Sequence, residues 1–293
     1  MLNFDYRKPT SIEDALSLRN EWGKSSSLLS GGTDLFLAIE EGLKTPTMLI
    51  DLKSIKELDG LDINKDSVFI GAGVTYSSLI KSSLIKKNLP AIWESSRLVA
   101  SMGVRNSATL IGNICNAVPS AESAAPLLVR DSLVNLSSLS GNRIIPIGEF
   151  FTGPRKTVVG DNEIVTSVSV PLVHGEFGEA YVKLGRYRGE DIAQVAVAVL
   201  VDSDWKYRIA YAAVGPVPMR IPDAEFILEG KTLTPGLIEK AVEAIIGTVS
   251  PITDIRASKE YRIHMCRIMF EKAVKAAVSR MVSSQPEYGS RLL

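Results

Sequence analysis

Hydrophobic and polar residues follow two different periods over the first fifty positions. Apolar residues recur at the helical spacing over residues 12–19, directly after the capping candidates at 10–11, and predict a helix. Apolar runs at 27–29 and 48–52 predict strands, and a second helix over 35–41 lies between them. The expected order after the first helix is therefore strand, glycine-containing turn, helix and strand.

From about residue 58 the pattern changes to short β-rich runs mixed with helices, which indicates a second subdomain. Strands are expected at residues 68–70, 132–139, 143–147 and 164–170. Helices are expected over residues 77–86 and 91–100. We therefore expect subdomains of about residues 1–57 and 58–174.

A proline- and glycine-containing segment at 171–175 predicts a linker, with a domain boundary near residue 174. Strands are expected beyond it at residues 180–184, 192–201 and 207–214, and helices over residues 234–246 and 258–282. The last helix has apolar residues at helical spacing, which predict a buried face: Tyr261, Met265, Ile268, Met269, Ala273 and Ala276. The pattern predicts an α+β protein whose larger domain, 1–174, precedes a smaller sheet-plus-helix domain, 175–293.

Composition and charge exclude several classes of partner. The chain has 293 residues, of which 45% are hydrophobic, and this is enough for two cores. Lysine plus arginine and aspartate plus glutamate both number 33, so no basic excess favours nucleic acid or anionic lipid. The first eight residues lack a signal-peptide core, and the longest apolar run, 195–201, is far below the roughly 20 residues of a membrane span. We expect a cytoplasmic protein without a membrane span.

The sequence contains few residues that bind metals or act as nucleophiles. The two cysteines, Cys115 and Cys266, form no Cys-x-x-Cys pair, and the only histidines are His174 and His264. A disulfide framework, an iron–sulfur cluster and a zinc site are therefore not supported, and no metal site is expected. No Walker A lysine, G-x-S-x-G or H-E-x-x-H motif occurs, and Gly71-Ala72-Gly73 has Tyr76 in place of a third glycine. Any chemistry is expected to reside on a bound cofactor.

Two glycine-containing turns are the strongest local signal for such a cofactor. They are Ser30-Gly31-Gly32-Thr33-Asp34 and residues 109–113, each beside an apolar run. Backbone N–H groups converge at such turns and bind phosphate, and two of them suggest a diphosphate-containing dinucleotide. Thr33 can add a hydroxyl donor, whereas Asp34 is expected to cap the following helix. A plain tight turn before a helix is the competing interpretation of the first string.

A polar segment between apolar runs follows the second turn. It includes Asn113, Asn116 and Glu122, and burying it without a ligand would be costly. Glu122 could accept hydrogen bonds from ribose hydroxyls of a dinucleotide. A solvated loop acid near a helix N-terminus is the alternative.

Six segments of the chain resemble the FAD-binding medium subunit of the molybdenum hydroxylases, the family that includes xanthine dehydrogenase and aerobic carbon monoxide dehydrogenase. They are residues 31–35, 105–116, 119–128, 150–154, 163–165 and 255–262. The segments occur in the same order and span nearly the whole chain. Within the family, the likeness is greatest to the separate flavin subunit of bacterial xanthine dehydrogenase.

The resemblance implies an FAD-binding domain of the PCMH/vanillyl-alcohol-oxidase type with two subdomains, followed by a C-terminal domain of the carbon monoxide dehydrogenase flavoprotein type. It implies that 29–35 and 109–113 surround the pyrophosphate, that Glu122 contacts the cofactor and that Lys183 closes the site over the isoalloxazine ring. The residues assigned to FAD are Leu29, Ser30, Gly31, Gly32, Thr33, Asp34, Leu35, Val99, Thr109, Gly112, Asn113, Glu122, Val165 and Lys183. Of these, Val99 and Val165 would lie near the ring, and Arg188, Glu190 and Asp191 would lie on an adjoining loop.

The chain departs from the family pattern at two positions. Ile111 stands where the family's Thr-x-Gly-Gly-Asn loop has its first glycine, and a β-branched residue resists a positive φ. If the site needs a positive φ there, FAD binding is weakened or the loop is rebuilt. The acid after Pro119 is usually aspartate in the family and is Glu122 here.

The resemblance implies a function in electron transfer with no catalytic side chain of the chain's own. Electrons would leave a molybdenum cofactor on a large subunit, cross iron–sulfur clusters on a small subunit, and reach this FAD before NAD⁺ or another acceptor. The alternative, which Ile111 motivates, is a non-redox nucleotide-binding or assembly subunit that retains the fold. A stand-alone flavin oxidase of the vanillyl-alcohol oxidase type is less supported, because no substrate-domain acid–base set is evident.

Overall fold

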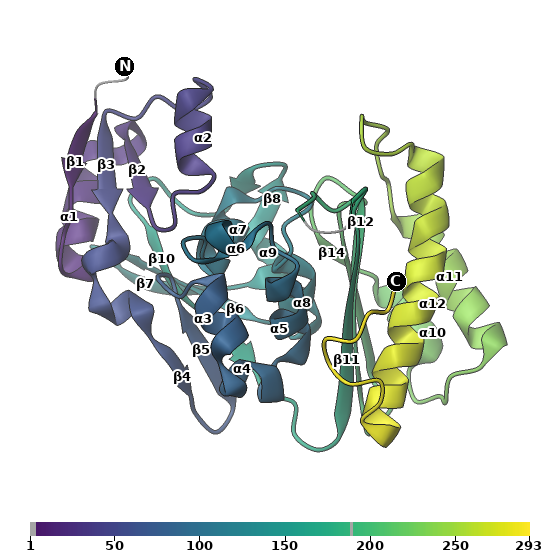
Figure 1. The fold of residues 1–293 in the computed structure, drawn as a ribbon. Coiled ribbons are helices and arrows are strands. Elements are labelled where there is room, and N and C mark those ends of the chain that lie inside the picture. The colour runs from purple at the N-terminus through teal and green to yellow at the C-terminus, as the bar shows by residue number, and fades with distance from the viewer. Residues whose placement is uncertain (1–3, 188–189) are drawn as a thin grey trace.

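The computed structural model describes residues 4–187 and 190–293, with three larger sheets that follow one another across the molecule (Figure 1). The first sheet is parallel, in the order β1-β3-β2. Its elements are β1 (Asp5–Arg7), α1 (Ile12–Trp22), β2 (Ser26–Leu29), α2 (Leu35–Glu40) and β3 (Met48–Asp51). The predicted order of strand, turn, helix and strand is confirmed. Ser11 caps α1 by accepting the N–H of Asp14 at 3.1 Å.

The second sheet is antiparallel, in the order β4-β5-β10-β6-β7. Its strands are β4 (Leu61–Ile63), β5 (Ser67–Gly71), β6 (Leu133–Ser138), β7 (Gly141–Pro146) and β10 (Ile164–Pro171). The α-helices of this region are α3 (Tyr76–Lys81), α4 (Ser83–Asn88), α5 (Pro90–Arg97), α6 (Met102–Arg105), α7 (Leu110–Asn116), α8 (Ala124–Val129) and α9 (Ile147–Phe150). A small hairpin, β8 (Phe151–Gly153) and β9 (Lys156–Thr157), and the 3₁₀ turns η1 (Gly23–Ser25), η2 (Leu52–Ser54) and η3 (Lys56–Asp59) complete the first half.

The third sheet stands between the helices of the first half and those of the second (Figure 1). Its antiparallel strands are β11 (Phe177–Leu184), β12 (Val195–Asp202), β13 (Tyr207–Ala212) and β14 (Met219–Arg220). The accompanying helices are α10 (Pro222–Leu228), α11 (Pro235–Thr248) and α12 (Lys259–Ser283). Successive side chains of a strand point to opposite faces, so Ala180 and Val182 pack under α12 while Tyr181 joins the core of the first half. The strand β11 therefore carries polar side chains toward α5 and α8.

Several predicted boundaries are wrong in detail. The helix expected over 77–86 is two helices, because the chain breaks at Ser82, whose side chain caps α4. The helix expected to reach residue 100 ends at Arg97, and the strand expected from 192 begins at Val195. On α12, Tyr261 is 45% exposed instead of buried, whereas Met265 and Met269 lie in the core as predicted. No helix in the described ranges combines the length and apolar character needed to cross a membrane.

Two ion pairs are buried where β11 and α12 meet the first half. Arg280 on α12 donates to Glu94 on α5, with 2.8 Å between Nη2 and Oε1. The same carboxylate accepts the N–H groups of Tyr181 at 3.1 Å and Gly289 at 2.8 Å. Arg130 pairs with Glu179 on β11, and all four charged side chains are at most 6% exposed. These contacts tie the two halves of the chain together.

The loop before α12 is held by Asp254, and this predicts a pH-dependent stability. Partial burial opposes ionisation, but hydrogen bonds from the N–H groups of Arg256 and Ala257 and from the Arg262 guanidinium lower the pKa of Asp254 to about 2. Because this folded-state pKa lies below the unfolded value, the stabilisation is present above the unfolded pKa and is lost as pH falls toward 2.

Asp254→Asn should lower the free energy of unfolding by about 2 kcal/mol near neutral pH. Urea titrations should show the gap to wild type narrowing below about pH 4. A gap that is constant with pH would contradict this origin.

Candidate functional site

Three segments that are distant in sequence meet at the end of β2. The hydroxyl of Ser30 donates to the carbonyl of Ala72 at 3.0 Å and shares a hydrogen bond with the hydroxyl of Thr109 at 3.2 Å. Thr75 and Thr109 form an isolated β-bridge, and the N–H of Tyr76 donates to Ala108 O at 3.0 Å. The two predicted glycine segments are thus direct neighbours, joined by the residues that follow β5.

The first glycine segment keeps its backbone open. A Cβ atom on Gly31 would lie 2.3 Å from Ser107 O and 2.8 Å from Ala108 Cα, so only glycine permits this approach of the two segments. Gly32 has a φ of +76°, the left-handed region that favours glycine. The backbone N–H groups of Gly31, Gly32 and Thr33 find no acceptor in the described part of the chain. They are available to bind an anionic group.

The expectation that Asp34 caps α2 is wrong. Asp34 occupies the position before the helix, but its own backbone is helical, with φ −95° and ψ −34°, and its side chain makes no capping hydrogen bond. A capping side chain needs an extended backbone to reach the N–H groups of the first turn. The side chain of Asp34 is exposed instead.

The second glycine segment is the start of a helix and not a turn. Thr109 is the N-cap of α7, and its hydroxyl accepts the N–H of Gly112 at 3.0 Å. Ile111 is 4% exposed, lies within the helix and has no positive φ. The strain considered for Ile111 is therefore absent, because a helical backbone accommodates a β-branched residue.

Glu122 and Lys183 form an ion pair across the two halves of the molecule. Lys183 Nζ, on β11, lies 2.8 Å from Glu122 Oε1 and 2.9 Å from Leu98 O. The side chains are 6% and 13% exposed for lysine and glutamate respectively, so the pair is shielded but reachable. Leu98 precedes the predicted ring-side residue Val99, whose carbonyl accepts a hydrogen bond from Arg105 at 2.7 Å. The structure thus brings Lys183, Glu122 and the backbone next to Val99 together.

Supporting residues that sequence reasoning missed connect these parts. The N–H of Ser123 donates to Asn113 Oδ1 at 3.3 Å, and the hydroxyls of Ser123 and Tyr76 share a buried hydrogen bond of 2.7 Å. Burial raises the pKa of Tyr76 well above its usual value, so its phenol stays protonated. In the sequence, Tyr76 excluded Gly71-Ala72-Gly73 as a dinucleotide-binding motif. In the structure, its hydrogen bond to Ser123 holds the residues that follow this glycine string against the site.

The remaining predicted residues divide into core and loop positions. Leu29, Val99 and Val165 are buried, and Leu35 is half-buried at the start of α2. Next to Val165, Thr166 O accepts the N–H of Ala72 at 2.9 Å, which places this part of β10 beside the site.

On the β11–β12 loop, Arg188 lies outside the described residues. Burial opposes ionisation of Asp191, but hydrogen bonds from three backbone N–H groups lower its pKa. The Asp191 carboxylate is therefore bonded within its own loop. Glu190 is exposed.

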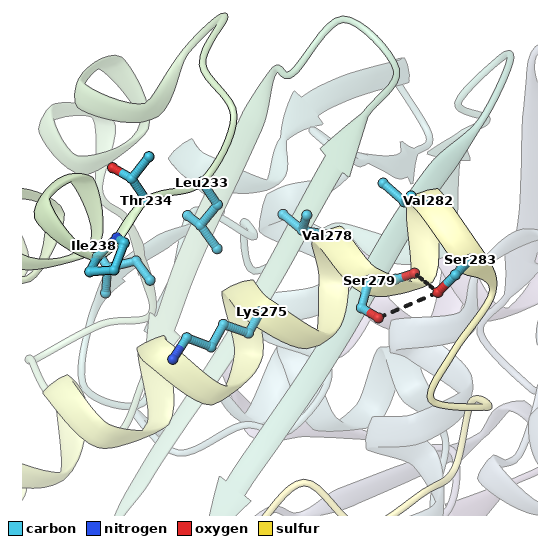
Figure 2. Close-up of a pocket in the computed structure, with 9 residues that line it drawn as sticks. Leu233, Thr234, Ile238, Lys275, Val278, Ser279, Val282 and Ser283 are labelled. Carbon is cyan, nitrogen blue, oxygen red and sulfur yellow. Dashed lines mark hydrogen bonds between the residues drawn. The ribbon is translucent and has the colours of Figure 1, made fainter.

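A separate groove lies between α11 and the C-terminal part of α12 (Figure 2). It measures about 400 Å³ and is lined mainly by apolar side chains, among them Leu233, Ile238, Val278 and Val282. Its lysine, Lys275, pairs with Glu271 on the same helix. The groove shares no residue with the site at β2 and α7. Among the described residues, no cluster of three or more histidine, cysteine, aspartate or glutamate side chains could hold a metal ion.

Comparison with known proteins assigns both halves of the chain. Residues 2–173 match the family model described as the FAD binding domain in molybdopterin dehydrogenase, and residues 179–277 match the CO dehydrogenase flavoprotein C-terminal domain. The xanthine dehydrogenase FAD-binding subunit of Escherichia coli O157:H7 is 31% identical over 94% of this chain and 96% of its own length. The carbon monoxide dehydrogenase medium chain of Afipia carboxidovorans is 31% identical over 95% of this chain and 98% of its own.

The solved structures include carbon monoxide dehydrogenase from Hydrogenophaga pseudoflava lacking the Mo-pyranopterin moiety of its cofactor. One of its chains matches with a TM-score of 0.92 and 31% identity, covering 96% of this chain and 99% of that one. The features of the site fit FAD, since open N–H groups at Gly31, Gly32 and Thr33 suit a diphosphate and lie next to the segment that Thr109 caps. The chain therefore belongs to the family of FAD-binding medium subunits of the molybdenum hydroxylases.

Proposed function

We propose that this chain is the electron-transferring FAD subunit of a molybdenum hydroxylase complex, with an iron–sulfur small subunit and a molybdenum cofactor large subunit as partners. Bound FAD would supply the redox chemistry, taking electrons from the iron–sulfur clusters and passing them to an acceptor. A xanthine dehydrogenase-like complex with NAD⁺ as acceptor and a cytoplasmic location remain our predictions. The similarity to xanthine and carbon monoxide dehydrogenase subunits over nearly the whole chain supports the general role.

The observation that carries the proposal is the joining of the two glycine segments beside a cross-domain ion pair. The N–H groups of residues 31–33 would bind the diphosphate, and the contact of Gly31 with Ser107 would hold the segment around Thr109 next to it. Lys183 has one N–H left after bonding Glu122 and Leu98 O, and Glu122 Oε2 is also open, so both can contact the cofactor. We place the domain boundary near residue 174, between β10 and β11.

The alternative of a non-redox subunit was motivated by Ile111. Because Ile111 lies in the helical first turn of α7 and has no positive φ, that motive no longer favours it. The electron-transfer role is therefore the one we propose.

The purified full-length chain should bind one FAD and be yellow. Reconstitution with FAD should give the visible flavin absorption bands, and denaturation should release FAD and not FMN, as chromatography of the released cofactor would show. Dithionite should bleach these bands reversibly because the bound flavin is redox-active. A chain that remains colourless after incubation with excess FAD would contradict the proposal. A chain that binds FAD which cannot be reduced would favour the non-redox alternative.

A further inference from the structure

One buried hydroxyl next to the flavin site has no partner. Tyr181 is 4% exposed, and its hydroxyl is one of three buried side-chain polar atoms without a hydrogen bond in the described part of the chain. The other two are the Nε atoms of Arg19 and Arg262, which bond through their other nitrogens. A tyrosine has a single polar group, so Tyr181 alone of the three leaves its side chain wholly unsatisfied. Such burial is unfavourable and calls for a specific partner.

The backbone of Tyr181 is held on both sides. Its residue pairs with Ala198 on β12, and its N–H donates to Glu94 Oε2 at 3.1 Å. Glu94 is itself held by the buried Arg280 guanidinium. The ring packs in the core of the first half, which restricts the side chain.

The hydroxyl lies in the field of the Glu122 carboxylate. Tyr181 and Lys183 are two residues apart on β11 and share the face toward the first half. Burial raises the pKa of Tyr181 well above its usual value, and the charge of Glu122 raises it further, so the phenol is protonated and can donate. Lys183 uses Oε1 of Glu122, and Oε2 accepts no hydrogen bond from the described residues.

We propose that Tyr181 is a positioning residue of the flavin site, whose hydroxyl donates to the Glu122 carboxylate, directly or through one water, when FAD is bound. Lys183 and Tyr181 then hold the carboxylate from two sides and fix the charge that faces the cofactor. This inference rests on the proposed function. It assigns a role to a buried side-chain donor that has no acceptor among the described residues.

Tyr181→Phe in the full-length chain tests the inference. The thermal midpoint of the apoprotein should be unchanged or raised, because the hydroxyl makes no hydrogen bond there. The Kd for FAD should rise about 10-fold, which corresponds to one lost hydrogen bond to a charged group. The midpoint potential of the bound flavin should fall, because a less neutralised carboxylate disfavours the electron-rich reduced ring.

Tyr211→Phe is the matched control on the other face of the same sheet. Tyr211 is fully buried, and its hydroxyl donates to Cys266 O at 3.0 Å under α12. This variant should lower the thermal midpoint and leave FAD binding unchanged. Two outcomes would overturn this inference while leaving the proposed function intact, provided that wild type binds FAD. In the first, Tyr181→Phe has the wild-type Kd and midpoint potential; in the second, it only loses stability, as Tyr211→Phe does. A wild-type chain that takes up no FAD would overturn the proposed function and this inference with it.

Discussion

Arg280→Met is expected to lower the free energy of unfolding by about 3–5 kcal/mol, the largest effect of any substitution considered for this chain. The guanidinium is fully buried and donates to Glu94, to Glu179 O at 2.7 Å and to Pro286 O at 2.9 Å. Its removal leaves the Glu94 carboxylate buried, and its remaining partners among the described residues are the N–H groups of Tyr181 and Gly289. A buried charge without its counterion is strongly unfavourable, because the attraction that offset its desolvation is lost.

Urea denaturation followed by circular dichroism would measure the effect, with Arg267→Ala as the matched control. Arg267 pairs with Glu239 at 2.6 Å, but the two side chains are 42% and 54% exposed. Exposed pairs contribute at most about 1 kcal/mol, so this variant should be close to wild type. The double variant Glu94→Gln/Arg280→Met should lose less than the sum of its single variants, because neither charge of this pair is left buried without its partner. A loss below about 1 kcal/mol for Arg280→Met would show that the network does not hold the two halves together.

Gly31→Ala is expected to weaken FAD binding by about 10–100-fold and to lower the free energy of unfolding by about 1–3 kcal/mol. The added Cβ would meet backbone atoms, Ser107 O at 2.3 Å and Ala108 Cα at 2.8 Å, so one of the two segments must move. The movement displaces the open N–H groups of residues 31–33 from the segment around Thr109. A substitution at the neighbouring Gly32 acts differently, because it strains a positive φ and crowds the Phe36 ring and Leu29.

FAD titration and thermal unfolding should be measured together on Gly31→Ala and on Gly103→Ala. Gly103 lies in α6, and the nearest atom to an added Cβ is Ser101 Oγ at 3.8 Å, which is ordinary contact. The control should bind FAD like wild type and be at least as stable, since alanine favours the helix. Wild-type FAD affinity in Gly31→Ala would show that contact between the two glycine segments is not needed for binding.

The order and type of most elements could be predicted because they depend on local periodicity. Short apolar runs predicted β2, β3 and β10, and the helical spacing of Met265 and Met269 predicted α12. Boundaries were less predictable, since capping by a single side chain such as Ser82 interrupts a helical pattern without changing its apolar spacing. The glycine segment at 109–113 was misread for a related reason: glycine favours turns, but the Thr109 cap and the buried Ile111 favour a helix start.

The sequence by itself determined the family, the cofactor and the two-part α+β organisation, because these depend on ordered segments and apolar patterns that local residues carry. Only the tertiary structure decided that Gly31 contacts Ser107, that Lys183 pairs with Glu122, and that the Tyr181 hydroxyl is buried without a partner among the described residues. The first two join residues from different parts of the chain, 61 positions apart for the ion pair. Their meeting depends on how the sheets pack and which face of β11 turns toward the first half, and no spacing along the chain contains that information.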